Sequence, residues 1–146
     1  MGPIRRFWRL PTADRTLLIQ AGLWLGATRL ALWLRPLRVV RRHLARAARS
    51  LRPERRVAAS PERIAWAISV AQRLIPSVTC LCQAVAAEAM LAQAGHPADL
   101  RIGVAKTPFG RLSAHAWVES DGHIVVGELR ELSAYEPLPP LPTERL

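Results

Sequence analysis

Two cysteines, Cys80 and Cys82, are the residues of this chain best suited to covalent chemistry. Cys80 directly follows Thr79, a residue type that caps helices, and the stretch after it is typical of a helix that ends at Gly95. In the first turn of a helix, the unpaired backbone N–H groups and the helix dipole favour a thiolate and can stabilise an oxyanion. The sequence therefore predicts Cys80 as a nucleophile. The alternative for any isolated cysteine is burial as a small apolar residue.

The predicted base for this nucleophile is His115, which lies 35 residues after Cys80 in the strand-like run AHAWVE. Such a base needs a third group that fixes its orientation. The dipeptide Asp121-Gly122 between two strand-like runs predicts a hairpin, and with these residues in the turn His115 pairs with Glu128. Glu128 is therefore the expected orienting carboxylate, whereas Asp121 at the turn tip is better explained by turn chemistry.

The remaining polar residues near this group have plainer interpretations. Cys82 lacks the helix-start position and points away from Cys80, so we expect it in the core. Gln83 lies one helical turn from Cys80 and is expected either to line the site or to pack against a helix. The spacing C-x-C is not a usual zinc motif, and we expect no metal and no cofactor. The other histidines are expected at exposed or loop positions: His43, His96 and His123.

Helices come first and strands last in the predicted order of elements. Ser60-Pro61-Glu62 marks a helix start, because it combines a capping hydroxyl, a proline at the first helical position and an acid at the positive end of the dipole. The expected helices cover about 13–34, 37–51, 61–74 and 80–94, and the expected strands cover 100–105, 114–119 and 123–128. The fold class is therefore α+β, with a small antiparallel sheet that carries His115 against the Cys80 helix. Four tryptophans at helical positions are expected to pack inside: Trp8, Trp24, Trp33 and Trp66.

Positive charge is concentrated in the first half of the chain. The formal charge is +10, and fourteen arginines but only two acids precede Ser60. Such a basic first half is suited to binding an anionic membrane surface or a partner protein. No motif of the kind that reads a nucleic-acid groove is present in the sequence. The apolar stretch 17–34 contains Arg29, which favours a buried or surface helix over a membrane span. Two free thiols and the absence of a signal-like start predict a cytoplasmic protein that can lie peripherally at a membrane.

Several motifs together resemble the lasso-peptide biosynthesis B2 proteins, which are transglutaminase-like leader peptidases. They are TCLCQA at 79–84, GHPA at 95–98, RIGV at 101–104 and AHAWVESDG at 114–122. The resemblance is specific from about 60 to 127, and the arginine-rich helical first half is similar in a general way. The acid of that family usually falls about twelve residues after the histidine, which here is Gly127, with Glu128 beside it. The role of the acid that orients His115 is therefore left to Glu128 or, less favourably, to Asp121, or is only weakly filled by either.

The resemblance implies a papain/transglutaminase-like core and a cysteine protease that removes the leader from a ribosomally made lasso precursor peptide. It also implies two partners, a B1-type leader-recognition protein and an ATP-dependent lasso cyclase. The expected organisation is a basic helical region over 1–59, a catalytic core over 60–136 and a proline-rich tail over 137–146, in one compact domain. Two other functions stay open. One is a different acyl-transfer enzyme on the same core, such as a transglutaminase or amidase, and the other is a non-enzymatic basic module that binds membrane or nucleic acid.

Overall fold

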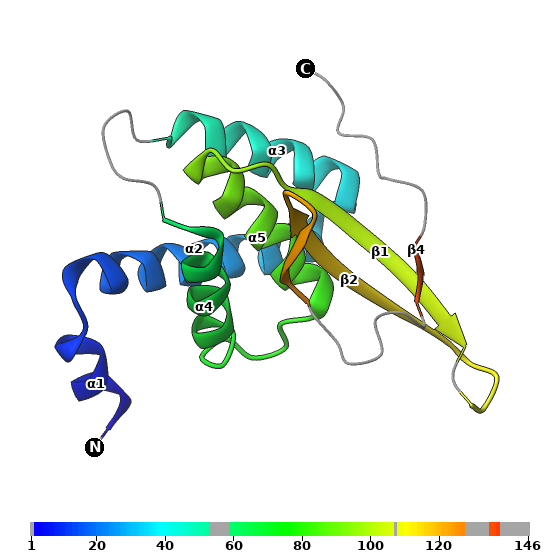
Figure 1. The fold of residues 1–146 in the computed structure, drawn as a ribbon, viewed down its shortest axis with the longest axis horizontal. Coiled ribbons are helices and arrows are strands. Elements are labelled where there is room, and N and C mark those ends of the chain that lie inside the picture. The colour runs from blue at the N-terminus through cyan, green and yellow to red at the C-terminus, as the bar shows by residue number, and fades with distance from the viewer. Residues whose placement is uncertain (1, 53–58, 107, 128–134, 138–146) are drawn as a thin grey trace.

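Helices and strands follow one another in the order that the sequence predicts (Figure 1). The computed structural model describes residues 2–52, 59–106, 108–127 and 135–137. Its helices are α1 (Pro3–Arg9), α2 (Thr12–Leu34), α3 (Leu37–Ser50), α4 (Pro61–Ala71) and α5 (Cys80–Ala94). Its strands are β1 (Asp99–Lys106), β2 (Leu112–Ser120), β3 (His123–Val126) and β4 (Glu136–Pro137). The predicted α+β class is confirmed, while α1 and the short β4 are additions that the sequence patterns did not indicate.

The predicted helix caps are present in the structure. The Ser60 hydroxyl accepts a hydrogen bond from the backbone N–H of Arg63 at 3.3 Å, and α4 follows. The Thr79 hydroxyl accepts one from the N–H of Cys82 at 3.2 Å, so α5 begins where the sequence indicates. Gly95 ends α5 with φ at 85°, in the left-handed region that glycine adopts without strain. Together these caps fix the position of Cys80 at the first residue of α5.

The four strands form one antiparallel sheet in the order β3-β2-β1-β4. Asp121 and Gly122 form the β2–β3 turn with φ values of 50° and 79°, as a two-residue hairpin turn with both central residues at positive φ requires. Ser120 pairs with His123 as predicted, but a β-bulge then shifts the register and Val118 pairs with Val126. The predicted register, which set Val118 opposite Val125, is therefore wrong beyond the bulge.

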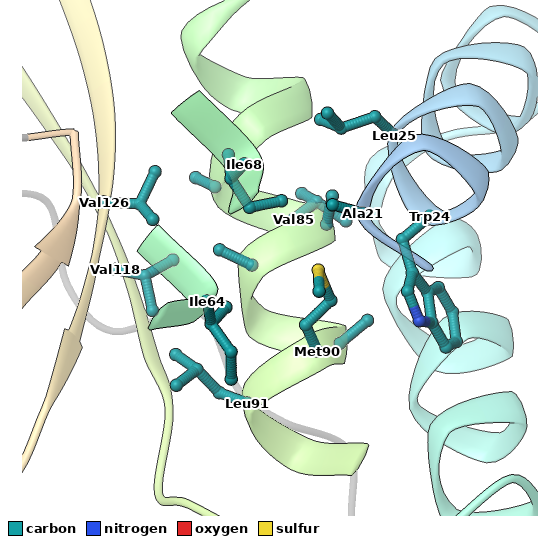
Figure 2. Close-up of a cluster of buried hydrophobic side chains, with 14 of the residues drawn as sticks. Ala21, Trp24, Leu25, Ile64, Ile68, Val85, Met90, Leu91, Val118 and Val126 are labelled. Carbon is teal, nitrogen blue, oxygen red and sulfur yellow. The ribbon is translucent and has the colours of Figure 1, made fainter. Parts of the chain in front are cut away.

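Helix α5 lies at the centre of the molecule and packs against α2, α3, α4 and β2 (Figures 1 and 2). Figure 2 shows the core on both sides of it, with Val118 and Val126 of the sheet on one side and Trp24 and Leu25 of α2 on the other. The small residues of α5 let these layers approach closely, since four of its six alanines are buried. A bidentate ion pair from Arg41 on α3 to Glu88 on α5, at 3.0 and 2.7 Å, fixes α3 over the same helix.

Candidate active site

Cys80 occupies the first position of α5 and is half-buried at the border of the core. Because the Thr79 side chain satisfies the N–H of Cys82, the N–H groups of Cys80 and Leu81 are the ones left without an acceptor inside the helix. Both point out of the positive end of the helix dipole, beside the thiol. This end of α5 can therefore hold a thiolate and receive an oxyanion that forms next to it.

Cys82 has the opposite environment, although it is only two residues away. It is 2% exposed, and its thiol donates a hydrogen bond to the carbonyl of Leu25 at 3.6 Å. Burial raises the pKa of the Cys82 thiol to about 11, with the positive charge of Arg29 acting in the other direction. Cys82 is therefore a neutral thiol near neutral pH, and its predicted place in the core is confirmed.

His115 lies near the middle of β2 and is 8% exposed. Its Nε2 lies 2.5 Å from the backbone carbonyl oxygen of Gly127. A carbonyl can only accept a hydrogen bond, so Nε2 carries the proton in this contact. In the neutral imidazole, Nδ1 then has the free lone pair, which is the atom that a general base uses.

Two aromatic rings surround the imidazole. The ring of Trp117 lies nearly parallel to it, with 6.2 Å between centroids, and the tilted ring of Tyr135 lies at 5.7 Å. Tyr135 is held in turn by a hydrogen bond between its hydroxyl and that of Ser113 at 3.3 Å. The Trp117 indole donates to Glu119 at 3.0 Å. This cluster buries the histidine and limits its rotation, so the ring has a defined direction before any substrate binds.

The backbone carbonyl of Gly127 makes the contact to His115 that was predicted for a carboxylate. Its φ is 94°, and a Cβ here would lie 2.7 Å from the carbonyl oxygen of Ala116 and 2.8 Å from the Cβ of Trp117. Only glycine fits this close approach, which brings the Gly127 carbonyl to His115. The signal was present in the sequence, because a glycine stands twelve residues after the histidine, where the similar family has its acid.

The two carboxylates that were considered for this role have different outcomes. Asp121 is exposed in the hairpin turn, which confirms its predicted part in turn chemistry. The pairing of His115 with Glu128 rested on the register that the bulge overturns. Glu128 itself lies outside the described residues, so its role stays a prediction.

Cys80 and His115 come from elements that pack against each other, α5 and β2. No hydrogen bond joins the two side chains among the interactions of the described residues. Ala116 belongs to the core on the helix side, so the alternation along β2 puts His115 on the other face, contrary to the expectation that it points toward α5. Beyond the paired residues of β3, Gly127 lies against Ala116 and Trp117 and places its carbonyl on the imidazole of His115. The described residues therefore show Cys80 and His115 on packed elements without a hydrogen bond between them, and catalytic hydrogen bonds often tighten only when substrate binds.

The other polar residues lie in helix packing, in a loop or at the surface. Gln83 donates to the side-chain oxygen of Gln72 at 3.5 Å, which assigns it to helix packing. His96 contacts the carbonyl of Ala59 at 2.7 Å in a loop, and His43 and His123 are exposed. The described part of the chain holds no group of three or more His, Cys, Asp or Glu side chains that could bind a metal ion.

A comparison with models of known protein families shows which family this chain belongs to. The model of the transglutaminase-like superfamily matches residues 22–139, which is 118 of the 146 residues. The chain belongs to the transglutaminase-like superfamily. Members are typically cysteine hydrolases or transferases, in agreement with a cysteine at the start of the central helix and a histidine on the adjoining strand. No curated protein and no solved structure matches the chain.

Proposed function

We propose that this protein is a cysteine peptidase that removes the leader from a lasso-peptide precursor. The observation that carries the proposal is the position of Cys80 at the capped start of α5, in a chain of the transglutaminase-like superfamily. The orientation of His115 supports it, because Nε2 is held by the Gly127 carbonyl and Nδ1 is left as the base. The choice of substrate rests on the resemblance of the motifs between 60 and 127 to the B2 leader peptidases.

The first half of the reaction forms an acyl-enzyme. His115 takes the thiol proton on Nδ1, and the sulfur of Cys80 bonds to the carbonyl carbon at the end of the leader. The oxygen of the tetrahedral intermediate accepts hydrogen bonds from the N–H groups of Cys80 and Leu81. When the C–N bond breaks, Nδ1 returns the proton to the leaving amine, which is the new N-terminus of the core peptide.

The second half of the reaction releases the leader. His115 removes a proton from water, and the hydroxyl oxygen attacks the thioester that joins Cys80 to the leader. The C–S bond then breaks, the sulfur takes back the proton, and the leader leaves with a free carboxylate. An amine in place of water would give a transferase or transamidase with the same residues, so the nature of the acceptor separates the peptidase from its nearest alternative.

The proposal includes partners that the chain itself does not supply. A B1-type protein would hold the leader, and a lasso cyclase would receive the core peptide with its new N-terminus. Both follow from the family resemblance.

The test is cleavage of the precursor encoded beside this gene, with the B1-like protein present, followed by mass spectrometry. Wild type is expected to cut once and leave a leader carboxylate. Cys80→Ala and His115→Ala are expected to be inactive, whereas the matched control Cys82→Ala retains activity because that thiol is buried and neutral. A leader that ends in an amide of an added amine would favour the transferase instead. Equal cleavage by wild type and Cys80→Ala would remove the proposal.

A further inference from the structure

Helix α2 is apolar on two opposite sides. One side enters the core through Leu17, Ala21, Trp24 and Leu25. The other side carries exposed apolar residues that we call the outer strip: Ile19, Leu23, Leu30, Trp33 and Leu34. At about 100° per residue, the strip falls within an arc of about 100° centred opposite the buried side. Its exposure is high, at 68% for Leu23 and 82% for Trp33, so no described part of the chain covers it.

Helix α1 extends this surface beyond the start of α2. It has no buried residue, and Ile4 and Trp8 are 72% and 66% exposed on one side of its two turns. The guanidinium of Arg15 lies 5.5 Å from the ring centroid of Trp8, and Arg15 falls on the same side of α2 as the outer strip. A tryptophan therefore stands near each end of the strip. The prediction that Trp8 and Trp33 pack inside is wrong: both are exposed, and Trp33 lies on the side of α2 that faces away from α4 and α5.

Positive charge surrounds the outer strip. Residues 1–52 contain twelve arginines, no lysine and a single acid, Asp14, which forms an ion pair with Arg63 of α4. Exposed arginines lie on α1, within α2 and directly after it: Arg5, Arg6, Arg9, Arg29 and Arg35. A second copy of the same surface would be repelled at close range, so the charge favours an anionic occupant.

We propose that α1 and the outer strip of α2 dock on an anionic lipid bilayer, with the helices lying in the plane of its interface. Leucines and isoleucines backed by arginines, with tryptophans at the ends, are the composition of interfacial helices. Arginine side chains reach from such a face to lipid phosphates, while tryptophan favours the boundary between headgroups and acyl chains. A partner protein would need an acidic groove to match both features, and the apolar face with aromatic ends fits a bilayer more directly.

Docking on the surface agrees with the packing of α2 better than crossing the bilayer. Among the described residues, α2 is the helix that is long and apolar enough to span a membrane. A third of its most apolar window is buried inside the protein, however, and α2 packs closely on α4 and α5. Inserting α2 across a bilayer would remove these side chains from the core. The exposed side alone is free to meet lipid.

The test is sedimentation of the purified full-length protein with vesicles of phosphatidylcholine alone or of phosphatidylcholine with phosphatidylglycerol. Wild type is expected to bind the anionic vesicles and to be released progressively by NaCl. The double variant Leu23→Gln, Trp33→Gln is expected to bind the anionic vesicles more weakly than wild type, by about tenfold or by a larger factor. The double variant Arg5→Glu, Arg9→Glu should also lose affinity for the anionic vesicles. Neutralising each arginine lowers the affinity about fivefold, and reversing its charge with glutamate lowers it further.

Matched controls use the same chemistry at exposed positions elsewhere. Leu74 and Phe109 are 76% and 92% exposed outside α1 and α2, so the double variant Leu74→Gln, Phe109→Gln is expected to bind like wild type. Circular dichroism and melting curves check that each variant is folded. Absence of wild-type binding to anionic vesicles would overturn the proposal. Equal vesicle binding by wild type and the outer-strip variant would also overturn it. So would a stable dimer or partner complex that covers Leu23 and Trp33 when vesicles leave both residues exposed.

Discussion

Replacing Gly127 by alanine changes the backbone that holds His115 without touching either of the proposed reacting groups. At φ 94° an alanine costs about 1 kcal/mol or more of backbone strain. Its Cβ would also lie 2.7 Å from the Ala116 carbonyl oxygen, and relieving that overlap adds about 1 to 3 kcal/mol. The chain relieves it by moving the Gly127 carbonyl, so the 2.5 Å contact to Nε2 of His115 is lost or lengthened.

A misoriented base should lower turnover more than substrate binding. Loss of the orienting contact is expected to reduce kcat about 100-fold, with little change in KM, when activity is measured well below the melting temperature. Nitrogen NMR of the labelled imidazole gives an independent readout, with Nε2 protonated in wild type and a mixture of tautomers in Gly127→Ala.

The matched control is Gly110→Ala. Gly110 also has a positive φ, 77°, but nothing lies within 4 Å of the position of its Cβ. It carries the same kind of strain without the overlap, so it is expected to lose about 1 kcal/mol of stability and to retain kcat. If Gly127→Ala kept the wild-type kcat and tautomer, the carbonyl would not orient His115, and Glu128→Gln would become the variant of interest.

Three further predictions follow from contacts in the helix layer. Folding raises the pKa of Cys82 to about 11, so the native state resists its ionisation: stability is unaffected below the unfolded pKa and falls as pH rises through about 9 to 11. Relative to Cys82→Ala, wild type should lose about 2 to 3 kcal/mol across that window in urea titrations, and an equal pH dependence of both proteins would contradict this. Iodoacetamide should label Cys80 at least about 100-fold faster than Cys82 near neutral pH, measured by peptide mass spectrometry, because Cys82 is both buried and neutral. Glu88→Ala leaves the Arg41 guanidinium without its bidentate partner and should cost about 2 to 4 kcal/mol in chemical denaturation, whereas a change under about 0.5 kcal/mol would mean that the pair is solvated.

Local signals in the sequence were sufficient for both ends of α5 and for the place of Cys80 in its first turn, but not for the end of α4, which lies at Ala71 and not at 74. Thr79 and Gly95 bound α5 through hydrogen bonds and a backbone conformation that depend on neighbouring residues only. The hairpin turn at Asp121-Gly122 is local in the same sense. Cys80 could therefore be singled out before the structure was known, and Cys82 could be assigned to the core.

The surroundings of His115 depend on long-range packing, which no local pattern specifies. The β-bulge between the pairs of Val118 and Glu119 moves Val126 opposite Val118, and one extra residue is enough to change every later pairing. Residue types also point only to side chains as orienting groups, whereas the backbone carbonyl of Gly127 contacts the imidazole. The exposure of Trp33 also depends on long-range packing. The sequence of a helix with two apolar sides does not indicate which side is buried against the rest of the protein.

The most direct test of the central claim is to trap the acyl-enzyme. Wild-type protein is mixed with the precursor and the B1-like protein, quenched in acid after short times, and measured by intact-protein mass spectrometry. Our account predicts a transient adduct with the mass of the leader acyl group, located on Cys80 by peptide mapping. The adduct should be absent in Cys80→Ala and present, with much slower formation, in Gly127→Ala. Cleavage of the precursor by Cys80→Ala at the wild-type rate, or an adduct located on Cys82, would contradict the mechanism.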